Sequence, residues 1–347
     1  MSKRLTIPVT FAAVLIALSV VVCIAGTALA GTAPFPKMDI KLGHQGEPEM
    51  SYTKGAEKFA ELVKERTGGA VNVQVFPMAQ LGSERDISAQ VKDNVTQLSI
   101  LTPGLLANYP GWGPVGVFSM PYIIRGATEE EQARILTKLA RGPIMQEMNE
   151  RAAKASGIRA LDLGWWYGNR HLTTKTKQVL KVADMQGLRI RTVEGPINGA
   201  AIQALGASAT PMPISELYTA LMMGVVDGQE NPPNTIYAHK YYEVQKYLSL
   251  TGHMTQHLVL CISETFFQSL SPELRALLIK AGQDAGDSQS GLQLKANDQA
   301  LQDLKAKGMV VATIDKAEFA NRTKDVWRAF EPAFGKGLYE KIVDAQK

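Results

Sequence analysis

Cysteine is nearly absent from this chain of 347 residues, which holds only Cys23 and Cys261. Cys23 lies in an apolar N-terminal segment, so a chain that loses this segment keeps a single thiol. No intramolecular disulfide can then form, even in an oxidising compartment. The fold must therefore be held by its hydrophobic core, and the residues that follow the segment are numerous enough for two domains.

Long apolar runs are lacking everywhere except at the N-terminus. Lys3 and Arg4 precede a nearly continuous apolar stretch over residues 6–25. Ala28-Leu29-Ala30 then supplies the small residues at alternate positions that signal peptidase needs. We therefore predict that residues 1–30 are a cleaved signal peptide and that the product is located in the periplasm. No later segment is apolar for long enough to span a membrane.

A large excess of charge is also missing. The formal net charge is +4, and it falls to +2 without the leader, because the leader holds Lys3 and Arg4 and no acidic residue. The remaining sequence contains no run of basic residues. Nucleic-acid binding depends on a basic surface, so it is not expected here.

The sequence lacks the short motifs of common enzymes. It has no Gly-x-Ser-x-Gly elbow, no Walker loop, no dinucleotide fingerprint and no Cys–His nucleophile signature. His253 and His257 have the i, i+4 spacing of helical metal ligands, but they lie in predicted strands without an acidic partner at metal spacing. We therefore expect no metal, no cofactor and no catalytic residue. An exported enzyme stays an alternative that a turnover assay would reveal.

What is present is an alternation of strand and helix patterns. Residues 38–43, 71–76 and 98–102 are typical of short strands, and residues 51–66 and 83–93 between them are typical of helices. A serine at the start of the second helix is a suitable N-cap. Repetition of strand and helix indicates a parallel sheet covered on both faces.

A second α/β unit is predicted after Gly168. Its elements are a strand over 188–191, a helix over 196–205, a strand over 208–210, a helix over 213–222 and a strand over 225–227. Two extended runs, 247–255 and 256–263, would then carry the chain back to the first unit across a turn near Gly252. Residues 272–307 keep a helical period, as one very long helix or two in line.

Several ordered blocks resemble a known family. The most specific are Pro211–Leu221 (Pro-Met-Pro-Ile-Ser-Glu-Leu-Tyr-Thr-Ala-Leu) and Val225–Pro232 (Val-Val-Asp-Gly-Gln-Glu-Asn-Pro). Gln80–Arg85, Ala183–Leu188 and Tyr241–Lys246 are supporting matches. Together they resemble the extracytoplasmic solute-binding subunit of the TRAP transporters, the family of dicarboxylate- and sialic-acid-type periplasmic receptors, over essentially the whole mature chain.

The resemblance implies an α/β fold of the periplasmic-binding-protein type, with two lobes, a central ligand cleft, hinge strands and a long helix that spans both lobes. We place the first lobe at residues 31–167 plus 257–300, and the second at residues 168–256 plus 301–347. Such receptors close on their ligand and deliver it to the membrane permease subunits. Most of them are monomeric, so we expect a monomer.

The resemblance also implies which residues of the second lobe contact the ligand. In the family, the arginine that ends the strand after an Asp-Met-x-Gly-Leu block forms a salt bridge with a carboxylate, and here it is Arg191. Arg170 and Asn231 occupy two further contact positions. A guanidinium matches a carboxylate with a planar fork, and an amide donates without adding charge. A hinge salt bridge for Arg170 and a turn before proline for Asn231 are the structural alternatives.

Contacts from the first lobe and from aromatic residues are predicted by position. His44 and Gln45 follow the first strand, and Thr102 follows the third. Trp166 lies in an aromatic run at the end of a strand, and Tyr218 lies in the helix of the Ser-Glu-Leu-Tyr block. Their rings could stack on the apolar face of a ligand, and core or hinge packing is the alternative for both.

These observations predict a periplasmic receptor for a small organic acid, which could be a sugar acid, a keto or hydroxy acid, or an aromatic acid. The same cleft could serve a C4-dicarboxylate or a ligand sensor, and the sequence does not separate a sensor from a transport receptor. Genes for two permease subunits beside this one would favour transport. We interpret Glu84 and Glu216 as solvated helix faces without a ligand role.

Overall fold

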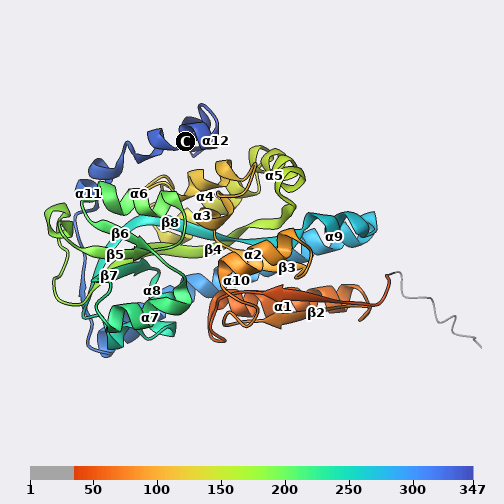
Figure 1. Ribbon diagram of the computed structural model, residues 1–347, viewed down its shortest axis with the longest axis horizontal. Coiled ribbons are helices and arrows are strands. Elements are labelled where there is room, and N and C mark those ends of the chain that lie inside the picture. The colour runs from red at the N-terminus through yellow and green to blue at the C-terminus, as the bar shows by residue number, and fades with distance from the viewer. Residues whose placement is uncertain (1–34, 347) are drawn as a thin grey trace, which may run out of the picture.

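The computed structural model describes residues 35–346, so the predicted signal peptide lies outside the described residues. Its centre is a sheet with strand order β2-β1-β3-β8-β4-β7-β5-β6, and β9 pairs with β8 (Figure 1). The strands are β1 (Met38–Gly43), β2 (Val71–Phe76), β3 (Leu98–Leu101), β4 (Ile158–Thr174), β5 (Arg189–Thr192), β6 (Ser208–Pro211), β7 (Gly228–Asn231), β8 (Tyr247–Ser263) and β9 (Val310–Ala312).

Helices connect most of the strands, and further helices follow the last strand at the C-terminal end of the chain. The α-helices are α1 (Ser51–Arg66), α2 (Glu84–Lys92), α3 (Pro103–Leu106), α4 (Glu129–Ala140), α5 (Pro143–Ser156), α6 (Pro196–Ala204), α7 (Ile214–Met222), α8 (Pro233–Ala238), α9 (Glu264–Ser269), α10 (Pro272–Ala306), α11 (Lys316–Thr323), α12 (Glu331–Phe334) and α13 (Leu338–Asp344). Short 3-10 helices are η1 (Gly113–Ser119), η2 (Val182–Met185), η3 (Tyr241–Glu243) and η4 (Val326–Ala329). No helix within residues 35–346 is long and apolar enough to cross a bilayer.

The predicted parallel α/β units are confirmed. β1 pairs in parallel with β2 and β3, and β5 pairs in parallel with β6 and β7. The predicted cap of α2 is also present, because Ser83 Oγ accepts from the Asp86 backbone N–H (3.2 Å) and Asp86 Oδ2 accepts from the Ser83 N–H (2.9 Å). The strand predicted over 225–227 is wrong: β7 begins at Gly228, and Val225 is exposed in the preceding turn.

Two long antiparallel strands, β4 and β8, run through the middle of the molecule and join its two halves (Figure 1). The predicted break of β8 near Gly252 is wrong. Arg170 pairs with Met254 and Leu172 pairs with Ser249, so a bulge on β8 absorbs the extra residues and the strand continues. Gly252, at φ +50°, lies inside this bulge, where its positive φ allows the irregular turn of the backbone.

The hydrophobic core is divided between the two halves. Buried residues such as Ile40 and Phe59 pack in the half that contains β1–β3, and residues such as Ile190 and Leu217 pack in separate clusters beside β5–β7. Phe334 of α12 packs in a cluster with Phe118 of η1, in the segment that we assign to the first lobe. The C-terminal helices therefore bring the end of the chain back onto the β1–β3 half.

One continuous helix, α10, braces the sheet and spans Pro272–Ala306, which confirms the first of the two alternatives. It packs against α1 and β4 and also against α8. Its first turn is capped by Ser271, whose Oγ accepts from the Leu274 N–H at 3.3 Å. The helix comes so close to β4 that only a glycine fits at position 286.

Gly286→Ala should destabilise the protein. A Cβ at this position would lie 2.7 Å from Asp162 Oδ2 and from two atoms of the Trp165 ring, all of which are buried. Overpacking of this kind costs about 1–3 kcal/mol. Gly291→Ala is the matched control in the same helix, because nothing lies within 4 Å of its Cβ. The control should gain up to about 1 kcal/mol from helix propensity. Urea unfolding compares them, and equal stability of the two variants would contradict the close approach.

Candidate functional site

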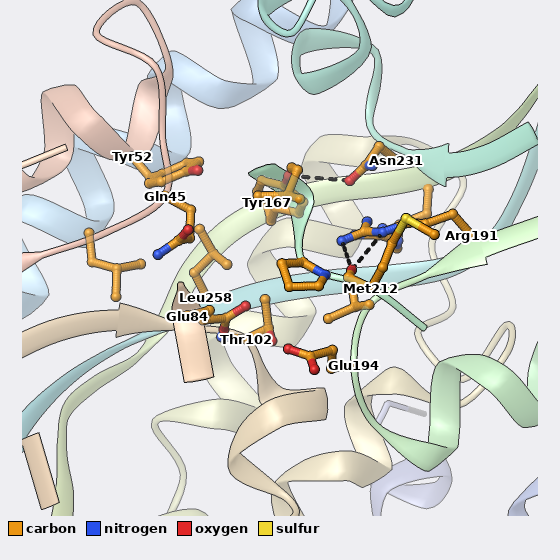
Figure 2. A pocket seen from close by; sticks show the side chains of 15 residues that line it. Gln45, Tyr52, Glu84, Thr102, Tyr167, Arg191, Glu194, Met212, Asn231 and Leu258 are labelled. Atoms are coloured by element: carbon orange, nitrogen blue, oxygen red, sulfur yellow. Dashed lines mark hydrogen bonds between the residues drawn. The ribbon is translucent and has the colours of Figure 1, made fainter. Parts of the chain in front are cut away.

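A cavity lies between the carboxyl ends of two pairs of parallel strands, β1 with β3 and β5 with β7. Gln45 follows β1, Thr102 follows β3, Glu194 follows β5, and Asn231 ends β7. In α/β sheets, ligands bind at these strand ends. The cavity encloses about 610 Å³, which includes the space at its open mouth. Figure 2 shows Gln45, Tyr52 and Glu84 on one side of it and Arg191, Met212 and Asn231 on the other. Its lining residues are Gln45, Tyr52, Glu84, Ile100, Thr102, Tyr167, Arg170, Arg191, Val193, Glu194, Met212, Pro213, Ile214, Asn231 and Leu258.

Arg191 brings a buried positive charge without a counter-ion to this cavity. The side chain lies on β5 and is 2% exposed. Its Nε and Nη2 both donate to the backbone oxygen of Met212, at 3.0 and 2.7 Å. Its Nη1 is buried without a hydrogen-bond partner, and no ion pair within residues 35–346 involves Arg191. Burial lowers the pKa of Arg191, yet a guanidinium stays charged in proteins. An anion that enters the cavity would therefore be attracted to it.

Arg170 also lines the cavity, but its charge is already compensated. Its Nε and Nη2 donate to the carboxylate of Glu230, with Nη2 at 2.9 Å from Oε1, and its Nη1 donates to Gln256 Oε1. Arg170 and Glu230 are each 1% exposed. Burial opposes the ionisation of Glu230, but the Arg170 guanidinium outweighs it and lowers the pKa of Glu230 to about 2. This pair is ionised at neutral pH and adds little net charge to the cavity.

Glu84 is the acidic group on the other side of the cavity. It is the first residue of α2 and accepts a hydrogen bond from the Thr102 N–H, at the end of β3. Burial raises the pKa of Glu84, while the hydrogen bonds from Thr102 and the charge of Arg191 oppose this increase. No ion pair of the described chain includes Glu84. The cavity therefore contains one carboxylate that is not neutralised by a neighbouring cation.

A second acidic residue that lines the cavity, Glu194, is neutralised by Arg85. Glu194 Oε1 lies 2.8 Å from Nη2 of Arg85, which belongs to the first turn of α2. The backbones also meet here, because a Cβ on Gly195 would lie 2.6 Å from the oxygen of Gly104. Gly195 has a φ of +140°, which a glycine adopts readily. The two sides of the cavity are thus in direct contact beside Glu194.

The cavity also has a rigid aromatic wall. The rings of Tyr52 and Tyr167 meet edge to face, with centroids 6.0 Å apart. Thr235 Oγ1 lies 2.7 Å from the Tyr167 hydroxyl, which donates to Asn231 Oδ1 at 3.4 Å. Asn231 Nδ2 in turn donates to Gln229 Oε1 at 2.5 Å. These bonds orient the amide and the phenol before any ligand arrives.

The structure brings five of the eight predicted ligand residues together in this cavity. They are Arg191, Arg170, Asn231, Gln45 and Thr102. The other three, His44, Trp166 and Tyr218, do not line it.

Each of these three side chains is engaged elsewhere. His44 is buried behind Tyr52, with ring centroids 5.4 Å apart, and burial lowers its pKa to about 4. Trp166 is in the core, where its Nε1 donates to Glu129 Oε1 at 3.1 Å. Tyr218 lies in a neighbouring groove and donates to Glu243 at 2.7 Å.

Four polar or charged lining residues are not among the eight predicted ligand residues: Glu84, Glu194, Tyr52 and Tyr167. The interpretation of Glu84 as part of a solvated helix face is wrong, because α2 begins at the cavity and burial raises the pKa of Glu84. No local pattern distinguishes Tyr167 from Trp166, because bulges shift the register of β4 on both sides of this pair. Among the described residues, no group of three or more metal-binding side chains is found.

Comparisons with known proteins agree with this geometry. The family model of the bacterial extracellular solute-binding proteins, family 7, matches residues 42–333. A solute-binding protein from Verminephrobacter eiseniae is 34% identical over 293 residues, which cover 84% of each chain. A TRAP periplasmic solute-binding protein from Bordetella bronchispeptica, with density interpreted as pantoate, is 32% identical at a TM-score of 0.82, covering 90% of this chain and 100% of that one. A TRAP periplasmic solute-binding protein from Polaromonas, bound to D-erythronate, is 29% identical at a TM-score of 0.81, covering 88% and 98%.

Proposed function

This chain belongs to family 7 of the bacterial extracellular solute-binding proteins, the organic-acid receptors of TRAP transporters, and we propose that Arg191 binds the carboxylate of its ligand. The observation that carries the proposal is the guanidinium of Arg191, which is buried in the cavity without a counter-ion and with an unpartnered Nη1. A buried charge is costly unless it is paired, so a ligand carboxylate would supply what the fold leaves out.

The other predicted contacts are assigned supporting roles. Arg170, held by Glu230 and Gln256, lines the cavity without adding net charge. Asn231 presents an amide oriented by Gln229. Gln45 and Thr102 face the ligand from the β1–β3 half, so a bound acid contacts both halves of the molecule. We retain no ligand role for His44, Trp166 or Tyr218.

Binding from both halves would favour a closed conformation. A ligand shifts an open–closed equilibrium only if it binds one state better than the other. Here residues of both halves surround one cavity, and Glu194 lies against Arg85. We propose that the lobes are residues 31–167 plus 257–300 and residues 168–256 plus 301–347, with α12 and α13 packed against the first lobe, and that β4 and β8 bend between the lobes.

The proposal also covers the location, the oligomeric state and the transport partner of the protein. We propose that residues 1–30 are removed on export and that the receptor works as a monomer in the periplasm, delivering its ligand to the TRAP permease. A ligand sensor would use the same cavity as a transport receptor. Permease genes beside the gene for this protein would favour the transport receptor over the sensor. No group of metal-binding side chains in the described chain favours an exported enzyme.

A thermal-shift screen tests the proposal. The chain, expressed with its leader and purified from the periplasm, is heated with pantoate, D-erythronate, uronates, keto acids and dicarboxylates. An acid present at about 100 times its dissociation constant should stabilise the fold by about 2.7 kcal/mol, which raises the melting temperature measurably. The proposal fails if no acid raises the melting temperature and native mass spectrometry finds no bound acid.

A further inference from the structure

Of the charged side chains that line the cavity, two form ion pairs and two do not. Arg170 is paired with Glu230, and Glu194 is paired with Arg85. Arg191 and Glu84 have no ion-pair partner among residues 35–346. The ligand therefore enters a cavity with one free cation and one free carboxylate.

We propose that Glu84 makes the receptor selective for hydroxylated monocarboxylates and excludes dicarboxylates; this rests on the proposed binding of the ligand carboxylate by Arg191. Glu84 acts as the specificity-determining residue on the β1–β3 side of the cavity. It accepts a hydrogen bond from a ligand hydroxyl and repels a second carboxylate. The C4-dicarboxylates, which the sequence left open as ligands, are thereby excluded.

The geometry supports this assignment. Glu84 and Arg191 extend from α2 and β5 into the same cavity, from different sides in Figure 2. An acid that contacts Arg191 with its carboxylate therefore directs its other end toward Glu84. The Thr102 N–H donates to one oxygen of Glu84 and holds the carboxylate in place. A carboxylate accepts several hydrogen bonds, so a ligand hydroxyl still finds an acceptor there.

A second ligand carboxylate would share a poorly solvated site with the carboxyl group of Glu84. Two carboxylates that share a site cannot both stay ionised without a large cost, and one of them must take up a proton. The only uncompensated cation of the described cavity residues, Arg191, is already used by the first carboxylate. A terminal hydroxyl has no such conflict, because it donates a hydrogen bond and carries no charge.

Glu194 does not have the same effect although it lines the cavity too. Its carboxylate is 2.8 Å from the Arg85 guanidinium, so its charge is neutralised before a ligand arrives. The contrast between Glu84 and Glu194 provides a matched control within the same cavity.

The test uses two acids that differ at one carbon. D-Erythronate and meso-tartrate share one carboxylate and two hydroxyls, and the terminal hydroxymethyl group of the first is a carboxylate in the second. D-Galactonate and galactarate form the same comparison with a longer chain. Isothermal titration calorimetry of the periplasmically purified protein measures each affinity. We expect each dicarboxylate to bind at least about 100-fold more weakly than its monocarboxylate partner.

Glu84→Gln tests the residue itself, because it keeps the shape and removes the charge. We expect it to reduce the ratio of the two affinities at least about ten-fold, chiefly by strengthening dicarboxylate binding. Glu194→Gln should change this ratio by less than about three-fold, because the native charge is already paired.

Two results would overturn the inference while the proposed function stands. One is dicarboxylate binding as tight as monocarboxylate binding by the wild-type protein, with both lost in Arg191→Met. The other is an unchanged ratio in Glu84→Gln. If none of the four acids binds and Arg191→Met changes nothing for any acid of the wider panel, the proposed function fails and the inference fails with it.

Discussion

Arg191→Met is expected to abolish acid binding without harming the fold. The variant removes the fork and charge that would hold the ligand carboxylate, and keeps an unbranched side chain in the same space. Loss of one partner from a buried, hydrogen-bonded charge pair costs about 2–5 kcal/mol, which corresponds to a roughly 30- to 5,000-fold weaker affinity. Calorimetric titration with the tightest-binding acid measures this loss.

The same variant should be at least as stable as the wild type when no ligand is present. The native guanidinium is buried without a counter-ion, so its replacement by an apolar side chain removes a desolvation cost. Arg189→Met is the matched control on the same strand, because Arg189 is half-exposed and pairs with Asp227 at 2.8 Å. The control should bind acid normally. Retained binding in Arg191→Met would contradict the assignment of the carboxylate site.

Glu230→Gln is expected to destabilise the protein by about 3–5 kcal/mol, because Arg170 is then left buried without its counter-ion. Unfolding by urea in the absence of ligand measures the loss. Glu243→Gln serves as the control: its carboxylate is exposed and accepts one bond from Tyr218, so the change should stay within about 0.5 kcal/mol. Similar stabilities of the two variants would show that the buried pair contributes little.

The pH dependence of stability tests the same pair independently. The pKa of Glu230 is lowered from 4.5 to about 2 in the folded protein. A group with a lowered folded-state pKa contributes stability above its unfolded pKa and loses it as the pH falls toward the folded value. The stability difference between the wild type and Glu230→Gln should therefore shrink between about pH 4.5 and pH 2. A difference that stays constant over this range would contradict the lowered pKa.

Local patterns predict the parallel units well because each strand and helix carries its own signal. The alternation at 71–76 gives β2, and Ser83 as an N-cap gives the start of α2. Long-range pairing has no such local signal. β8 stays one strand through Gly252 because β4 continues beside it, and that partner is far away in the sequence.

The residues of the cavity likewise fall into two groups: those that local patterns predict and those that depend on long-range pairing. Arg191 lies one residue before the end of β5 and Asn231 ends β7, so their position at the cavity follows from the strand pattern and the family motif together. Which of Trp166 and Tyr167 faces the cavity depends on the bulges that shift the register of β4, and these require the partner strand. Glu84 appears on an ordinary helix start, and only the approach of Thr102 from β3 shows that it borders a cavity.

A crystal structure of the protein with the tightest-binding acid of the panel tests the proposed site most directly. We predict a ligand carboxylate oxygen about 2.7–2.9 Å from Arg191 Nη1 and a ligand hydroxyl that donates to Glu84. A carboxylate bound away from Arg191, with Nη1 still unpartnered, would contradict the proposed function.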